Sequence, residues 1–223
     1  MTFLAIDRSC MEDLLFWQSL SRSLAARPAN PDPIAIVHAL GEHTERILES
    51  GGVDVERQLG LIRTRQADSD LLRRAAREEG RRIANALTEG GISAVSFMGS
   101  DRGLSAVQDG VPAFRATAWL RTLADSGAVP LISAYMDLED GLGTEWNLLQ
   151  GIAGFCRQGD QVVILSSREP LKKGKSVLSP ASPEIRDTEG VLGLIRAGVS
   201  VRISGVSGLA AGAGNAGVAI VAE

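Results

Sequence analysis

The chain has 223 residues, of which 44% are apolar and 22% charged, and its formal net charge is −4. This length and composition favour one globular domain, or two closely joined lobes, with a buried core. The acidic balance argues against nucleic acid as a partner, because nucleic-acid-binding proteins usually carry a basic excess on one face. No run reaches the roughly 18 apolar residues of a membrane span, and no signal peptide is recognisable, so we expect a cytoplasmic protein without a membrane partner.

Short apolar runs alternate along the chain with longer segments of helical periodicity. In chain order the predicted elements are a strand over Thr2–Ile6, a helix over Met11–Ala26, a strand over Pro33–His38, helices over Glu42–Glu49 and Asp68–Glu89, a strand over Ile92–Met98, a helix over Phe114–Ala124, a strand over Val129–Tyr135, a helix over Trp146–Cys156, a strand over Gln161–Ser166, a helix over Glu189–Ala197, and strands over Val199–Ile203 and Val218–Val221. Strands that alternate with helices of this length predict an α/β fold with a mostly parallel sheet covered on both faces.

The charged residues of the longest predicted helix include Arg81, Arg82, Glu78, Glu79 and Glu89. Because basic and acidic side chains are interleaved there, we interpret them as a solvated helix face. The acidic group Asp137, Glu139 and Asp140 predicts a hairpin tip, with a Mg²⁺ site as the alternative, and the glycine-rich run over 205–217 predicts a flexible turn between strands.

Metal and disulfide chemistry find little support in the sequence. Cys10 and Cys156 lie far apart without metal-ligand spacing, and His38 and His43 are the two histidines of the chain. We therefore expect a reducing compartment, no disulfide framework and no metal site made by histidine or cysteine.

Ligands of such sheets bind beside the carboxyl ends of the strands, so the residues that follow each strand are informative. Four segments there carry motifs: PIAIVHALGEHTERILESGG over 33–52, GISAVSFMGSDRG over 91–103, GAVPLISAYMDLEDGLGTEWN over 127–147, and GVSVRI with GNAGVAI over 198–203 and 214–220. In this order and spacing they resemble the amino acid kinase family, and its acetylglutamate kinase branch most closely.

The resemblance implies a three-layer αβα sandwich over residues 1–223, with a substrate lobe over about 1–150 and a nucleotide lobe over about 151–223. It also implies transfer of the γ-phosphoryl group of ATP, with Mg²⁺, to the carboxylate of a small acyl-amino acid in arginine biosynthesis. Glycine-rich turns and lysines serve that chemistry by bringing backbone N–H groups and positive charge to the phosphates.

Several of these positions are altered in this chain. The family's Lys-x-Gly-Gly turn after the first strand is replaced by Ala5-Ile6-Asp7-Arg8, and the second catalytic lysine falls at Asp187, beside Arg186. Leu40 replaces a glycine of the next turn, and Leu149 replaces an aspartate. A like charge about 4 Å from a phosphate costs on the order of 4 kcal/mol at an effective dielectric constant of 20. The changes predict weak or absent kinase activity, as in a pseudoenzyme.

The substrate side resembles the family more closely. Arg65, in Arg65-Gln66-Ala67-Asp68, matches an arginine that grips the substrate carboxylate; Arg63 is a rival, and a plain surface arginine is the alternative. Asn147 could bind substrate or cap a helix. Gly41 could offer an N–H group or only turn the chain.

The three lysines of the chain, Lys172, Lys173 and Lys175, fall where the family places its nucleotide loop, although a solvated basic loop is the alternative.

Two functions therefore remain open. One is a divergent acetylglutamate kinase-like enzyme that uses ATP and Mg²⁺. The other is a non-catalytic module that binds a small acyl-amino acid or nucleotide, or that regulates an active kinase. The helix over Met11–Ala26 could supply a homo-oligomer surface, with core packing as the alternative.

Overall fold

The computed structural model describes residues 1–27, 32–58, 60–101, 104–108, 111–114, 118–138, 141–166, 177–182, 185–212 and 217–221. Within these ranges eight strands form one sheet in the order β12-β14-β13-β11-β1-β2-β8-β5. All neighbours are parallel except β13 and β14, which are antiparallel. The bounds are β1 Thr2–Ile6, β2 Ile34–His38, β5 Ala94–Met98, β8 Val129–Ser133, β11 Gln161–Ser166, β12 Val177–Leu178, β13 Ser200–Gly205 and β14 Val218–Ile220.

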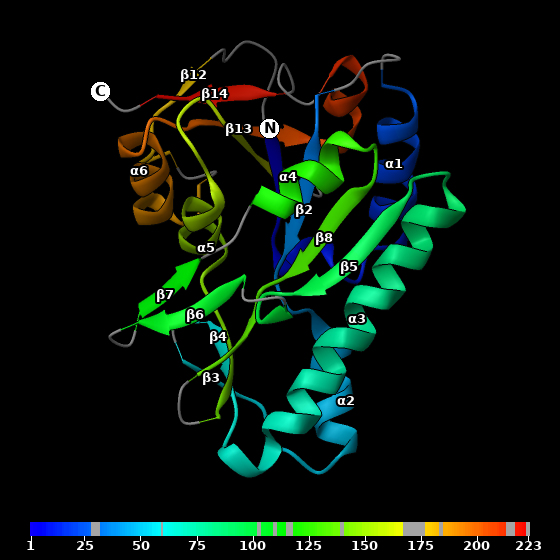
Figure 1. Cartoon of the computed structure of the whole chain (residues 1–223), viewed down its shortest axis with the longest axis vertical. Coiled ribbons are helices and arrows are strands. Elements are labelled where there is room, and N and C mark those ends of the chain that lie inside the picture. Colours follow the sequence, from blue (N-terminus) through cyan, green and yellow to red (C-terminus); the bar gives the residue numbers. More distant parts are fainter. Residues whose placement is uncertain are drawn as a thin grey trace.

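Helices cover both faces of this sheet (Figure 1). The helices are α1 Leu14–Ala25, α2 Glu42–Ser50, α3 Ser69–Glu89, α4 Ala118–Asp125, α5 Leu148–Phe155 and α6 Thr188–Arg196, with short 3-10 helices η1 Arg8–Cys10, η2 Gln66–Asp68 and η4 Val206–Ala211. Leu4 and Ile6 of β1 pack on the side of α1 and α3, and Phe3 and Ala5 pack on the side of α4, α5 and α6. Alternation along a strand buried on both faces explains the continuous apolar run.

The predicted three-layer αβα fold with a mostly parallel sheet is confirmed. Residues before 150 supply β1, β2, β8 and β5, and later residues supply the other half of the sheet. The two halves meet where β1 pairs with β11. Whether they behave as separate substrate and nucleotide lobes stays a prediction.

Two smaller sheets complete the described structure. Antiparallel strands form one in the order β3-β4-β10-β9, beyond the carboxyl ends of β2 and β8, and the other is the hairpin β6–β7 (Figure 1). Their bounds are β3 Glu56–Gln58, β4 Leu61–Arg63, β9 Tyr135–Asp137, β10 Gly143–Glu145, β6 Ser105–Gln108 and β7 Val111–Phe114. Leu40, Leu48, Ile62, Leu72 and Tyr135 form a small core between the first of these sheets, α2 and α3.

The structure corrects three expectations. The helix predicted over Phe114–Ala124 begins only at Ala118, because Phe114 ends β7, which pairs with β6. The strand predicted over Val129–Tyr135 divides into β8 and β9, because Tyr135 pairs with Glu145 in the second sheet. The segment over 205–217 is not simply a flexible turn, since it contains η4, whose Val206 and Leu209 are buried against α1.

Candidate functional site

The amino-terminal end of α2 lies just after β2, at the sheet edge where ligands of α/β folds bind. Helix N-termini present unpaired N–H groups and a partial positive charge, so they attract anions. Here three carboxylates of the chain itself occupy that end. Glu145 of β10 accepts the Leu40 N–H at 2.8 Å, Glu79 of α3 accepts the Gly41 N–H at 2.9 Å, and Glu12 accepts the His43 N–H at 2.9 Å.

These carboxylates are held in place by further contacts. Glu145 also accepts the Ile62 N–H at 3.0 Å, and Glu79 accepts the Thr44 hydroxyl at 2.5 Å. Gly41 caps α2 without a side chain, and a Cβ added there would lie 2.6 Å from Glu79 Oε1 and 2.7 Å from Met11 Cβ. The absence of a side chain at Gly41 therefore allows the buried glutamate to reach the backbone.

A chain of alternating charges extends from this end toward β1. Arg8, which follows β1, pairs with Glu45 of α2. Arg57 of β3 donates from Nε to Glu45 at 2.9 Å, and its Nη1 lies 3.4 Å from Glu145 Oε2. Glu45, Arg57 and Glu145 are largely shielded from solvent, which strengthens their attraction and raises the cost of breaking any one pair.

Burial sets the protonation of the groups around α2. It raises the pKa of Glu79 to about 7, against the opposing effects of the hydrogen bonds from Thr44 and Gly41. Burial likewise raises the pKa of Glu145. Burial lowers the pKa of His38, at the end of β2, to about 4. The neutral ring donates from Nδ1 to the Ala39 carbonyl at 2.9 Å, and His38 Nε2 has no hydrogen-bond partner within the described residues.

The turn after β1 is also internally paired. Asp7 caps η1 by accepting the Ser9 N–H at 2.8 Å, and its other oxygen lies 3.4 Å from Nη1 of Arg186. The family resemblance implies one lysine in the turn after β1 and another at Asp187, beside Arg186. In this chain an ion pair joins these two segments, between Asp7 and Arg186, whose side chain is 77% exposed.

The predicted substrate residues lie at separate places around this edge. Gly41 donates its N–H to Glu79, as described above. Arg65 caps η2 and is 82% exposed, with a weak ion pair to Asp68 at 3.3 Å. Asn147 is the N-cap of α5 and accepts the Gln150 N–H at 3.0 Å. The rival Arg63 is exposed on β4.

The predicted nucleotide residues Lys172, Lys173 and Lys175 lie outside the described residues. Where the structure is described, carboxylates of the chain already accept the Ser9 N–H after β1 and the Leu40 and Gly41 N–H groups after β2. The described residues also contain no group of three or more histidine, cysteine, aspartate or glutamate side chains that could hold a metal.

The sequence alone did not predict which carboxylates bind the backbone N–H groups at the N-terminus of α2. The interpretation of the charged residues of α3 as a solvated face is wrong for Glu79, which is 0% exposed. Glu79 shares the buried stripe of Leu72, Ala76 and Ile83, and this helical spacing was the available signal. The burial of Glu145 had no comparable signal, since it depends on the pairing of β10 with β4, which is distant in the sequence.

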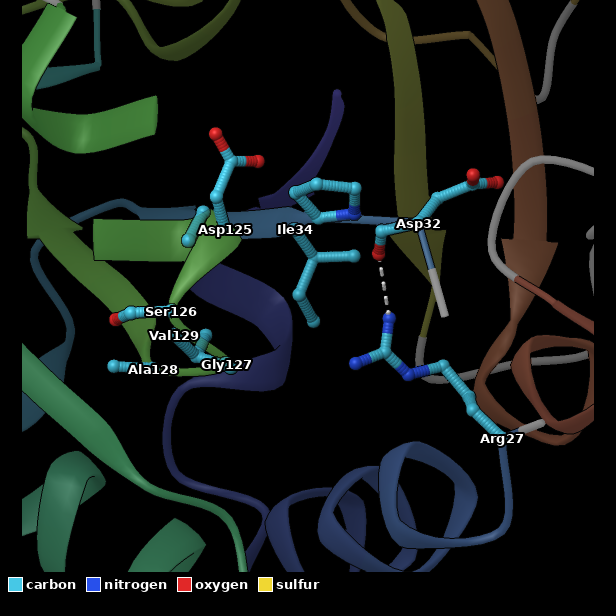
Figure 2. Close-up of a pocket in the computed structure, with 10 residues that line it drawn as sticks. Arg27, Asp32, Ile34, Asp125, Ser126, Gly127, Ala128 and Val129 are labelled. Atoms are coloured by element: carbon cyan, nitrogen blue, oxygen red, sulfur yellow. Dashed lines mark hydrogen bonds between the residues drawn. The ribbon is translucent and has the colours of Figure 1, made fainter. Parts of the chain in front are cut away.

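The opposite, amino-terminal edge of the sheet carries an open hollow of about 370 Å³ at the starts of β2 and β8. Figure 2 shows Arg27 and Asp32 facing the segment Asp125–Val129 across it. Nη1 of Arg27 donates to the backbone oxygen of Asp32 at 3.1 Å, and Nε donates to that of Leu24 at 3.3 Å. None of the sequence-predicted site residues lines this hollow.

No protein-family model and no curated protein matches this chain. Solved structures do match it. The protein smu.665 of Streptococcus mutans is 16% identical, with a TM-score of 0.69, and covers 100% of this chain and 98% of its own. An isopentenyl phosphate kinase is 16% identical, with a TM-score of 0.68 and 99% coverage of each chain.

The N-acetylglutamate synthase of Neisseria gonorrhoeae, solved with coenzyme A and N-acetyl-glutamate, is 17% identical, with a TM-score of 0.67. It matches 100% of this chain but only 59% of its own. These likenesses establish that the chain has the amino acid kinase fold. Among the described residues, no helix has both the length and the apolar character needed to cross a membrane.

Proposed function

We propose that this chain is a non-catalytic module with the amino acid kinase fold, which binds a small acyl-amino acid and does not transfer phosphate at an enzymatic rate. The observation that carries the proposal is the filling of the α2 N-terminus by Glu145, Glu79 and Glu12. Phosphoryl transfer depends on preorganised N–H donors and positive charge around the phosphates. Donors already bonded to buried carboxylates cannot serve that purpose unless the carboxylates leave.

The charges of the β1 turn support the same proposal. A nucleotide phosphate approaching this turn would meet the carboxylate of Asp7, while Arg8 is already engaged by Glu45. Both arginines of this region, Arg8 and Arg186, are therefore at least partly neutralised. This arrangement disfavours specific acetylglutamate kinase activity in the chain acting alone.

Arg65 supports an acyl-amino acid as the ligand. Its guanidinium is exposed, and the pair with Asp68 is a surface ion pair, which contributes only about 0–1 kcal/mol. A ligand carboxylate could therefore take over Arg65 at little cost, and an arginine can grip a carboxylate with two hydrogen bonds.

The test is thermal stability with ATP–Mg²⁺, acetylglutamate or arginine, combined with a coupled assay of ATP turnover. We expect acetylglutamate alone to stabilise the chain, by about 2.7 kcal/mol at 100 times its dissociation constant. Arg65→Ala should abolish this effect, and Arg63→Ala, a matched exposed arginine, should retain it. Turnover near the low end for kinases, about 1 s⁻¹, would establish the enzyme instead, and stabilisation by ATP–Mg²⁺ without turnover would make a nucleotide the ligand of the module.

A further inference from the structure

Glu79 is a buried acid whose two oxygens have different environments. Oε2 accepts both the Gly41 N–H at 2.9 Å and the Thr44 hydroxyl at 2.5 Å. Oε1 has no hydrogen-bond partner within the described residues, although the whole residue is 0% exposed. A buried carboxylate oxygen without a donor is costly when the group is ionised. Oε1 is therefore the natural place for a proton.

The charged groups around Glu79 compensate the negative charge of its carboxylate only in part. Arg82, one turn further along α3, lies 3.8 Å from Oε1, outside hydrogen-bond distance. The same Arg82 lies 3.7 Å from Glu12 Oε1, in the segment before α1, and donates to the Met11 carbonyl at 3.1 Å. His38 of β2, which is also affected by Arg82, is held neutral by burial. Gly41 and Thr44 contribute uncharged donors, and the charge of Glu12 raises the pKa of Glu79 further. His43 of α2 has a pKa lowered by burial.

Burial favours the protonated acid and outweighs the attraction of Arg82 at 3.8 Å, in agreement with the pKa of about 7 for this residue. An ionised carboxylate makes stronger hydrogen bonds than a neutral one, roughly twice as strong. Protonation at Oε1 would therefore weaken the hold of Oε2 on both of its donors, while the residue stays in place.

We infer that Glu79 is a proton-operated clamp on the amino-terminal end of α2: the ionised side chain holds the Gly41 N–H and the Thr44 hydroxyl firmly, and the protonated side chain loosens them. The inference goes beyond the proposed function, which places the ligand carboxylate at Arg65: it concerns the donors that the carboxylates occupy, and protonation is the event that releases them. An anion that binds beside Glu79 would favour its protonated form, so binding and proton uptake are coupled.

The experiment follows the backbone amide signals of Gly41 and Thr44 by NMR between pH 5.5 and 8.5. Three proteins are compared: the wild type, Glu79→Gln, and Glu78→Gln, which changes the exposed neighbour on the same helix. In the wild type and in Glu78→Gln, both signals should shift with one common midpoint near neutral pH. In Glu79→Gln the component with this midpoint should disappear, whereas a component from the neighbouring His43, whose pKa burial lowers, should remain. A flat Gly41 signal in the wild type, or an unchanged titration in Glu79→Gln, would overturn the inference.

A second measurement keeps the inference testable if Glu79→Gln does not fold. The carboxyl ¹³C signal assigned to Glu79 in the wild type should titrate well above those of the exposed glutamates; a Glu79 signal that titrates in the ordinary range would overturn the inference. ATP turnover is a separate readout. Rapid turnover would contradict the proposed function and leave the clamp intact, whereas a missing titration would remove the clamp alone.

Discussion

The two ends of β2 offer an instructive contrast. At the carboxyl end, where ligands of this fold class are expected, the buried Glu145 and Glu79 and the half-buried Glu12 occupy backbone donors of the turn and of α2. At the amino end, an open hollow is lined by Arg27, Asp32 and Asp125, and Arg27 donates there to the exposed backbone oxygen of Asp32. The contrast shows that the edge of an α/β sheet where ligands usually bind can be occupied by side chains of the same chain. The carboxyl end of β2 is called the closed end and the amino end the open end. If the contacts of the closed end are as stabilising as they indicate, substitutions there should lower the free energy of unfolding more than substitutions at the open end.

The largest effect is expected from Glu145→Ala. The substitution leaves the N–H groups of Leu40 and Ile62 without their acceptor and removes a partner of Arg57. Breaking a buried charged network in this way costs about 3–5 kcal/mol. Urea unfolding monitored by circular dichroism measures the free energy of unfolding directly.

The matched control for Glu145→Ala is Asp125→Ala at the open end, where the side chain is exposed. Its effect should stay within about 0.5 kcal/mol. Equal effects of the two substitutions would mean that the closed end is not the more tightly built region, and the contrast between the two ends would fail.

The second effect concerns pH. Burial raises the pKa of Glu79 from 4.5 to about 7, so its stabilising contribution is full below pH 4.5 and is lost as the pH rises toward 7. Burial lowers the pKa of His38 from 6.5 to about 4, so its contribution is full above pH 6.5 and is lost as the pH falls toward 4. The two contributions, each about 3 kcal/mol, therefore oppose one another between pH 4.5 and 6.5.

Single variants should separate these opposing contributions. On acidification from pH 6.5 to 4.5, Glu79→Gln should lose stability relative to the wild type, because only the His38 contribution remains. His38→Gln should gain stability relative to the wild type over the same interval. Urea unfolding at several pH values gives both comparisons, and parallel pH profiles for all three proteins would show that neither group titrates as described.

The sequence predicted the sheet well because its strands are buried on both faces, and burial leaves continuous apolar runs such as Ile34–His38. The resemblance implied altered turns after β1 and β2, since the absence of a lysine near Asp7 and the leucine at position 40 are visible in the chain itself. The sequence did not predict that carboxylates would fill the second turn. Glu79 and Glu145 are 38 and 105 residues away from their backbone partners, and such distant pairings depend on how the second sheet and α3 fold against α2.

The smallest effect is expected from alanine substitutions at two glycines, Gly41 at the closed end and Gly127 at the open end. Gly41 has φ −94°, which any residue can adopt, but an added Cβ would lie 2.6 Å from Glu79 Oε1 and 2.7 Å from Met11 Cβ. Overpacking of this kind costs about 1–3 kcal/mol. Gly127, beside the hollow, has φ +88° and no atom within 4 Å of an added Cβ, so alanine there meets only backbone strain of about 1 kcal/mol.

Gly41→Ala should therefore be more destabilising than Gly127→Ala in urea unfolding, although the backbone of Gly41 is relaxed and that of Gly127 is left-handed. The order separates crowding from backbone strain, because each glycine carries only one of the two costs. If Gly127→Ala proved the more damaging substitution, Glu79 would have to move away from Gly41 easily. The α2 N-terminus would then be open to an external anion, and the case against phosphate binding at this turn would lose its physical basis.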